Sequence, residues 1–407
     1  MKPVATETIL FRSPSPQDVY CYSPSICRGE AGRLVASFDL GGAGVAGLEG
    51  PKSDSGDFGL ANQLRIHVSD DRGVTWRETA QLPMMHTRLF RAGGRLYALG
   101  QSGRLLISAS CDNGESWSAP AVIEAEGSYE PGTSIDFHNG RLYLEMERKR
   151  EFDTWPGVAQ VLLSADENAD LTRPESWTFS EPFFLPEHIA MAQPFGMPLY
   201  PEGETAPGRY NGRCGCLETN VLRIRDPNHL LYDPEDRTLV LLSRLHAGGI
   251  ANMAVMLRGF EHPGGRLEIG MFSTPGGAPY LFVPLPGGQM KFHIEYDPAG
   301  RLYWMASSQT TDSMTRPELL PPERYNLPDN ERHRLVLHFS RNLVDWCFAG
   351  VIAIGNSPKE SRHYAGMTID GDDLLVLSRS GDAQARSAHN GNLITLHRIS
   401  GFHGLAY

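Results

Sequence analysis

The segment Arg244-Leu245-His246 has the clearest capacity for chemistry in this sequence. Strand alternation would direct Arg244 and His246 to the same side of a strand. An arginine binds a carboxylate through two parallel hydrogen bonds, and a histidine beside it acts as an acid or a base near neutral pH. The alternative is structural, with the arginine paired to an aspartate and the histidine bonded to backbone. Two other pairs have the same spacing: His86 with Arg88, and Arg362 with Tyr364.

Cys214 and Cys216 are separated by a single residue. With His229 or His246 they would make a structural zinc site of thiolates and imidazoles. However, a spacer of one residue is shorter than is typical of such sites, and no second cysteine pair follows. We therefore expect no catalytic metal and no cofactor.

Composition narrows the class of protein. The chain has 407 residues, of which 41% are hydrophobic and 21% charged, as in globular proteins. The net charge of −11 argues against a nucleic-acid partner, which needs a basic surplus. No apolar run approaches the roughly 20 residues that cross a bilayer, and no secretion signal is readable. We expect a cytoplasmic protein with no membrane partner and with mostly free thiols; the sequence does not indicate an oligomeric state.

The elements that would position these residues are short strands. There are 43 glycines and 29 prolines, and short apolar stretches lie between them without a helical period. A phrase of Gly-Arg-Leu followed by an apolar strand returns along the chain, in strict or looser form, at six hairpin centres. Its clearest copies begin at Gly32, Gly94, Gly140 and Gly300. Repeated antiparallel units of this size predict a β-propeller.

A second repeat is sharper. The segments Ser69–Trp76 and Ser110–Trp117 both read Ser-x-Asp-x-Gly-x-Thr/Ser-Trp, and they lie 41 positions apart. The aspartate of such a motif accepts bonds from backbone amides of a tight turn, the glycine adopts a positive φ, and the tryptophan packs between sheets. We therefore interpret these residues as structural braces and not as catalytic groups.

This motif is the Asp box, and the chain resembles the sialidase (neuraminidase) superfamily. The resemblance implies an all-β fold, a six-bladed β-propeller of four-stranded antiparallel blades, in a single domain over 1–407. The strand ETILFR, residues 7–12, would complete the last blade. Insertions are expected on the pocket side near 41–62, 186–217 and 310–334. The blades are expected near 20–84, 85–125, 128–186, 220–275, 288–355 and 360–400.

The resemblance also implies which face carries the site. Asp boxes lie between the third and fourth strands of a blade, so the starts of first strands and the ends of second strands lie on the opposite face, with the pocket. Candidate catalytic residues there are His246, Tyr364, His86, His229 and Glu218. Candidate substrate-binding residues are Arg244, Arg362, Arg379, Arg88, Lys291 and Asp39.

By the same resemblance, Tyr364 matches the tyrosine nucleophile and Glu218 the glutamate that assists it, while a nearby carboxylate is the alternative nucleophile and a histidine an alternative acid/base. Asp39, or an aspartate in the stretch 53–57, is the acid/base. Arginines hold the carboxylate of the substrate, but Tyr22 stands where the superfamily has the first of three.

Three functions remain open. The first is a glycosidase of the sialidase-like superfamily that acts next to an acidic, carboxylate-bearing sugar. The second is a lyase that cleaves uronate-containing glycans by β-elimination, with histidine and tyrosine as base and acid. The third is a propeller that binds the same sugars without turnover. All three predict an oligosaccharide or polysaccharide with an acidic sugar as the partner.

Overall fold

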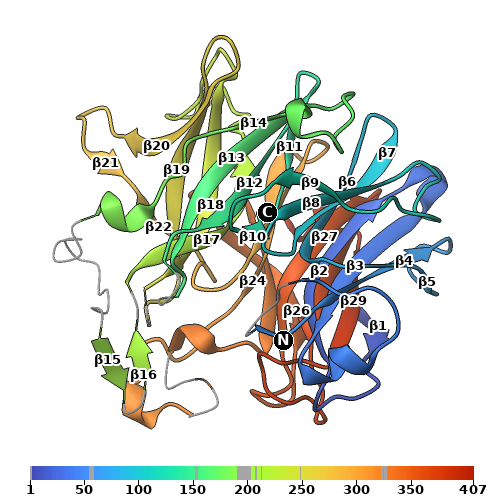
Figure 1. Ribbon diagram of the computed structural model, residues 1–407. Helices are drawn as coiled ribbons and strands as arrows, with labels where there is room; N and C mark the ends of the chain where they lie inside the picture. The colour runs from blue at the N-terminus through green and yellow to red at the C-terminus, as the bar shows by residue number, and fades with distance from the viewer. Residues whose placement is uncertain are drawn as a thin grey trace.

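Six antiparallel sheets arranged around a common centre make up the fold (Figure 1). The computed structural model describes residues 2–54, 59–151, 155–189, 203–206, 209–211, 213–247, 249–321, 324 and 328–407. The prediction of an all-β, six-bladed propeller with four-stranded blades is confirmed. No helix in the described part of the chain has the length and hydropathy to span a membrane.

The first three blades follow one another along the chain. Blade one contains β2 (Tyr20–Arg28), β3 (Leu34–Gly41), β4 (Gln63–Ser69) and β5 (Arg77–Leu82). Blade two contains β6 (Met85–Ala92), β7 (Arg95–Gln101), β8 (Leu105–Ser110) and β9 (Ala121–Glu124). Blade three has an inner strand in two parts, β10 (Ser128–Pro131) and β11 (Asp136–His138), which both pair with β12 (Arg141–Lys149), followed by β13 (Val158–Asp166) and β14 (Trp177–Phe179).

The remaining blades carry the longer additions. Blade four contains β17 (Gly215–Leu222), β18 (Thr238–His246), β19 (Met253–Glu261) and β20 (Leu267–Ser273), with the short strands β21 (Pro279–Tyr280) and β22 (Phe282–Pro284). Blade five contains β23 (His293–Asp297), β24 (Leu302–Ser308), β25 (Arg334–Ser340) and β26 (Cys347–Ile354). Blade six contains β27 (Arg362–Asp370), β28 (Asp373–Ser380), β29 (Leu393–Ser400) and β1 (Thr6–Arg12).

Short elements lie outside the blades. A separate hairpin of β15 (Gly203–Ala206) and β16 (Arg209–Asn211) stands at the lower left in Figure 1, near the turn η6 (Pro317–Leu319). Two of the expected insertions, 186–217 and 310–334, therefore approach each other there. The other 3₁₀ turns are η1 (Glu30–Gly32), η2 (Ala43–Gly47), η4 (Pro174–Ser176), η5 (Leu185–Glu187), η8 (Pro328–Asn330) and η9 (Phe402–Leu405).

Strand β1 closes the ring, as the sequence predicts. It pairs antiparallel with β29, with Thr6 opposite Arg398 and Arg12 opposite Leu393 (Figure 1). In the same blade Glu7 accepts two hydrogen bonds from Arg362, at 2.8 Å each. Closure covers the edge of β29, which would otherwise be exposed, and makes β1 the outer strand of blade six.

Apolar side chains fill the space between successive sheets. Phe38 and Leu40 of blade one, for example, pack with Leu375 and Leu377 of blade six, and all four are buried. Because each sheet has polar rims and apolar faces, burial of these faces against neighbours holds the blades in a ring.

The two eight-residue motifs fold into the same turn, between the third and fourth strands. Asp71 accepts hydrogen bonds from the backbone N–H groups of Val74 (3.1 Å) and Thr75 (2.8 Å). Asp71 also accepts a hydrogen bond from the Thr75 hydroxyl. Together these bonds, of which the hydroxyl bond has the largest effect, lower the pKa of Asp71 to about 2. Asp112 repeats the arrangement with Ser116.

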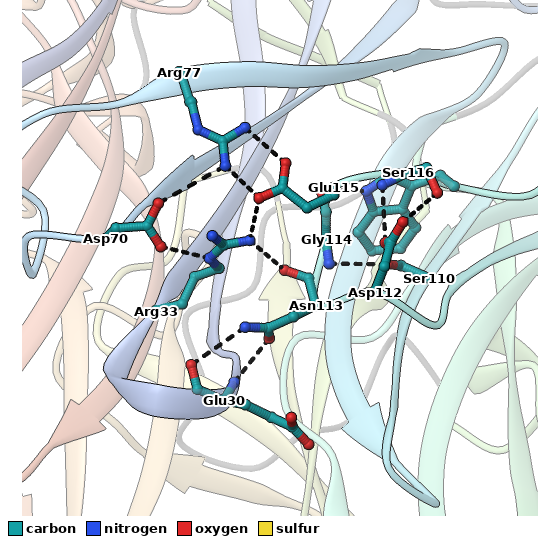
Figure 2. A network of polar contacts seen from close by, with 11 residues as sticks. Glu30, Arg33, Asp70, Arg77, Ser110, Asp112, Asn113, Gly114, Glu115 and Ser116 are labelled. Atoms are coloured by element: carbon teal, nitrogen blue, oxygen red, sulfur yellow. Dashed lines mark hydrogen bonds and ion pairs between the residues drawn. The ribbon is translucent and has the colours of Figure 1, made fainter.

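Each motif turn braces its blade against the preceding one. Trp76 packs into the core between blades six and one, and Trp117 into the core between blades one and two. Figure 2 shows polar contacts that join the second turn to blade one. There Arg33 donates to Asp70 (2.6 Å) and to Glu115 (2.7 Å). The carboxylates of Asp70 and Glu115 are exposed although Arg33 is mostly buried, so these ion pairs orient the turns more than they stabilise the fold.

The two motif glycines give a matched test of this packing. Gly73 and Gly114 both have φ of +90°, but an added Cβ would lie 2.7 Å from Leu396 at Gly73 and 3.3 Å from Val68 at Gly114. Gly114→Ala should therefore lower the free energy of unfolding by about 1–2 kcal/mol from the left-handed backbone alone. Gly73→Ala should cost about 1–3 kcal/mol more through overpacking. Denaturant unfolding of both variants measures the difference, and equal losses would contradict the packing argument.

Candidate active site

The inner strands of four blades leave regular β conformation at the same place, near their starts. The register of each strand shifts beside one residue other than glycine that has a positive φ. These residues are Ser23 (φ 44°), His86 (φ 53°), Glu218 (φ 56°) and Tyr364 (φ 50°). A left-handed residue of this kind costs roughly 1–2 kcal/mol, and such bulges are used to re-aim side chains.

Hydrogen bonds between neighbouring inner strands hold these bulges in place. Each joins a backbone N–H of one blade to an acceptor on the next. They run from Leu89 to Ser25 Oγ (3.0 Å), from Thr133 to Thr219 O (2.6 Å), from Ile294 to Asn220 Oδ1 (2.9 Å) and from Met367 to His293 Nδ1 (2.8 Å). These bonds join the inner strand of blade one to that of blade two, and they link the inner strands of blades three, four, five and six to one another.

Two of the bulge residues, Glu218 and Tyr364, meet at Arg244. Its Nη1 donates to the hydroxyl of Tyr364 (2.9 Å) and to Oε2 of Glu218 (3.2 Å). Its Nε donates to the carbonyl of Gln289 (2.8 Å), which fixes the guanidinium plane. All three side chains are buried. The sequence placed these three residues on one face, and the structure brings them into contact through one nitrogen.

Two more guanidinium groups lie over the Tyr364 ring. Arg332 is 5.2 Å and Arg379 is 4.6 Å from the ring centroid. Arg379 also lies 4.4 Å from the ring of Tyr22, so its cation is between two aromatic faces. Arg379 was predicted, whereas Arg332 was not.

Arg332 comes from the insertion that the sequence places on the pocket side of blade five. Its Nε donates to Asn330 Oδ1 (2.7 Å), and its Nη1 contacts Nδ1 of His363 (3.2 Å). Burial, followed by the charges of Arg332 and Arg379, holds the pKa of His363 well below its usual range. Nδ1 of this imidazole accepts a hydrogen bond from the guanidinium group and so orients Arg332.

The acidity of Tyr364 follows from these neighbours. Burial alone would raise its pKa, but Arg244 lowers it, with further contributions from Arg332 and Arg379. The net pKa lies below the usual value of a phenol. A tyrosine that ionises more readily is a better nucleophile and a better base near neutral pH.

A second charged group surrounds Glu130, in β10. Arg88 Nη2 donates to it (3.0 Å), the ammonium of Lys291 contacts the same oxygen, and His86 Nδ1 lies 4.0 Å away. Although burial opposes ionisation, these cations lower the pKa of Glu130 to about 2. Arg88 and Lys291, predicted to bind substrate, therefore already have a carboxylate partner, which neutralises one of their two positive charges.

Glu145 and Glu147 differ from Glu130 in that their pKa values are raised and not lowered. They are alternate residues of β12, both fully buried. Burial, followed for Glu147 by the neighbouring carboxylates, raises both pKa values well above the usual range. Glu147 also accepts the backbone N–H of Glu218. Glu147 therefore lies next to Glu218, and both Glu145 and Glu147 stand near the end of a second strand, where the sequence places pocket residues.

Asp39, the predicted acid/base, accepts hydrogen bonds from the backbone of blade two and from the end of the loop before β4. It is fully buried and accepts hydrogen bonds from the N–H of His86 (3.1 Å) and from Nδ2 of Asn62 (3.0 Å). Asp54, in the other stretch predicted for this role, forms an ion pair with Arg104 at 2.9 Å. Asp57 lies outside the described residues.

The other predicted histidines have different surroundings. His246 is buried at the end of β18, two residues beyond Arg244 and opposite Gly215. The ring of His86 contacts Gln101 through Nδ1 (3.3 Å). His229 was wrongly placed on the pocket face, because the first strand of blade four is β17 and ends before it. Both of its ring nitrogens contact backbone groups, those of Asn342 (3.1 Å) and Leu231 (2.9 Å).

Arg362 also lies elsewhere than the sequence predicts. It was predicted to share a side with Tyr364, but the bulge at Tyr364 breaks the alternation of β27. Its guanidinium reaches across the sheet to Glu7 and also donates to the carbonyls of Ser361 and Gly381 (2.8 Å each). Arg362 therefore belongs to the closure of the ring.

The cysteine pair lies in the apolar core between blades three and four. Cys214 and Cys216 are buried free thiols, and Cys216 donates to Oε1 of Gln160 at 3.0 Å. Within the described ranges, no three residues among His, Cys, Asp and Glu gather closely enough to hold a metal ion.

The arrangement is similar to solved propellers. The α-L-arabinofuranosidase of Fusarium graminearum, of family GH93 and bound to arabinobiose, has a TM-score of 0.51 and 13% identity over 98% of both chains. Trypanosoma rangeli sialidase in complex with sialic acid has a TM-score of 0.54 and 15% identity, over 100% of this chain and 60% of that one. A Dyadobacter fermentans protein of unknown function has a TM-score of 0.54 and 14% identity, over 98% and 99%.

These similarities establish the fold, which is that of the sialidase-like propellers. No protein-family model and no curated protein matches the chain.

The acidity of Tyr364 can be measured directly. The phenolate absorbance of the wild type minus that of Tyr364→Phe should titrate with a midpoint below the usual value of about 10, because three guanidinium groups favour the anion. Tyr143→Phe is the control, because the pKa of Tyr143 is shifted in the opposite direction. Burial, followed by its hydrogen bond to Glu261, raises the pKa of Tyr143 to about 12. A Tyr364 midpoint above that of a free phenol would contradict the geometry.

Proposed function

We propose that this protein is a glycoside hydrolase that acts next to a carboxylate-bearing sugar. The observation that carries the proposal is the contact of Tyr364 and Glu218 with one nitrogen of Arg244. We also propose that the two motif turns are Asp boxes and that the chain is a member of the sialidase superfamily.

The arginines favour an anionic sugar. Arg244, Arg332 and Arg379 surround one tyrosine, with Glu218 as the paired carboxylate. The Nε of Arg379 is buried and has no hydrogen-bond partner among the described residues. A buried donor of this kind is expected to receive a ligand atom, and a carboxylate is the natural partner of a guanidinium fork.

Of the ligands bound by the similar propellers, this cluster fits sialic acid better than arabinobiose, because arabinobiose carries no charge. The same argument extends to other acidic sugars. The substrate class proposed is therefore an oligosaccharide with a carboxylate near the bond that is cleaved.

The proposed chemistry uses side chains and water. The Tyr364 oxygen attacks the anomeric carbon while the bond to the leaving oxygen breaks, and Glu218 receives the phenolic proton. Glu145 or Glu147, whose pKa values burial raises, donates a proton to the leaving oxygen. Water then attacks the anomeric carbon and breaks its bond to Tyr364. The water gives one proton to the carboxylate that served as the acid, and Glu218 returns its proton to Tyr364, so the sum of the products equals substrate plus one water.

Substitution of the nucleophile and of its carboxylate tests this mechanism. Tyr364→Phe and Glu218→Gln should each lower kcat/KM by about 10²–10⁴-fold, the usual contribution of such groups. His229→Ala should leave activity unchanged, because His229 contacts backbone at the other end of blade four. Rates and product masses are measured on a panel of sialylated and uronate-containing oligosaccharides by mass spectrometry.

The summed masses of the products distinguish hydrolysis from elimination and from binding without turnover. Elimination is the second candidate, favoured by the lowered pKa of Tyr364, which would also suit a base that removes the proton beside a uronate carboxylate. Its products would sum to the substrate alone. Recovery of every glycan intact, with binding retained, would identify a non-catalytic sugar-binding propeller. Either result would overturn hydrolysis.

Arg332 gives a separate test of the acidic substrate. Arg332→Ala should raise KM by about 10–100-fold through loss of a charge-assisted hydrogen bond to the carboxylate. Arg332→Lys should restore only part of the affinity, because an ammonium cannot reproduce the planar fork. Arg316→Ala, in the same insertion, is the control, since Arg316 is exposed and pairs with Glu318. Equal KM values for Arg316→Ala and Arg332→Ala would contradict the role.

A further inference from the structure

The face of the ring opposite the candidate active site contains a cavity. A cavity of about 400 Å³ opens where the inner strands of blades three, four and five end. Its wall includes Asp136 and Phe137 of β11, Arg225 after β17, and Glu295 and Tyr296 of β23. Tyr364 and Glu218 stand near the starts of inner strands, so the cavity is at the opposite end from the candidate active site.

The charges of this wall cancel. Asp136 accepts from Arg223 Nε (3.0 Å) and from Arg225 Nη2 (2.7 Å). The fourth charge is that of Glu295, which lies 3.1 Å from Nε2 of His293. The backbone N–H of Met367 donates to Nδ1 of His293, so Nδ1 carries no proton. The ring then holds its one proton on Nε2 and is neutral, and this histidine adds no charge to the wall. Two carboxylates and two guanidinium groups then sum to zero, which favours a neutral ligand over an ion.

Aromatic surface is also available in the cavity. Phe137 is 39% exposed, so part of its ring is open to a ligand in the cavity. Tyr296 is half-buried, with the Arg225 guanidinium 5.7 Å from its ring centroid. Within the described ranges, the Tyr296 hydroxyl has no hydrogen-bond partner. The cavity thus combines apolar faces with both donors and acceptors.

We propose that this cavity is a second carbohydrate site, which binds one neutral sugar unit of an oligosaccharide. The C–H face of a sugar ring would pack on Phe137 and Tyr296. Its hydroxyl groups both donate and accept, so they match the carboxylate of Glu295 and the guanidinium of Arg225. A volume of about 400 Å³ lies within the range of sites for small ligands. The proposal does not depend on the chemistry at Tyr364.

Binding to the full-length Tyr364→Phe protein tests it without interference from turnover. The probes are four neutral disaccharides, namely cellobiose, lactose, xylobiose and arabinobiose, followed by titration calorimetry and ligand-observed NMR. At least one should bind with a millimolar or tighter Kd. Phe137→Ala and Glu295→Gln, each added to Tyr364→Phe, should weaken that binding at least about five-fold. Leu230→Ala is the matched control, since Leu230 is 74% exposed outside the cavity wall.

The outcomes separate this site from the proposed active site. Binding that Phe137→Ala weakens and Leu230→Ala leaves unchanged supports the second site, whatever activity the wild type has. Binding that Phe137→Ala leaves unchanged but Arg244→Met abolishes would place the sugar at the Tyr364 face and overturn the proposal. Failure of all four probes to bind at about 10 mM would also overturn it.

Discussion

The candidate site depends on one backbone constraint, the left-handed bulge near the start of an inner strand. In a regular strand successive side chains point to opposite faces, so neighbouring residues cannot converge on one point. The bulges at Glu218 and Tyr364 break that rule and turn both side chains toward Arg244. Their backbone strain is sustained because hydrogen bonds between neighbouring inner strands fix the ring at the same level.

Electrostatic balance explains why so many charges remain buried together. A lone guanidinium or carboxylate at this depth would be strongly destabilising. Here Arg244 has Glu218, and Lys291 and Arg88 share Glu130, while burial favours the neutral form of Glu145 and Glu147. The surplus is positive and is concentrated around Tyr364. The protein itself therefore fixes the positions of these charged groups, which is the preorganisation that the proposed function requires.

Much of this was predictable from the sequence, because the repeats define strand positions. The Gly-Arg-Leu phrase and the eight-residue motif located six sheets and their polarity, and from these followed Arg244, Tyr364 and Arg379, whereas Glu218 came from the family resemblance. Alternation failed where the backbone is irregular, so Arg362 was assigned to the wrong side. Arg332 was missed because it comes from an insertion with no repeat to align it. His229 was misplaced because blade four begins earlier than its hairpin signal suggested.

The closure of blade six has a consequence for how the molecule is made. Tyr364 and Arg379 stand in a sheet whose outer strand, residues 6–12, leaves the ribosome long before the other three. The early strand has no partner until β29 is synthesised, and Glu7 waits equally long for Arg362. The sheet that carries Tyr364 and Arg379 can therefore be completed only after residues 393–400 have been synthesised, although its outer strand is among the first residues made.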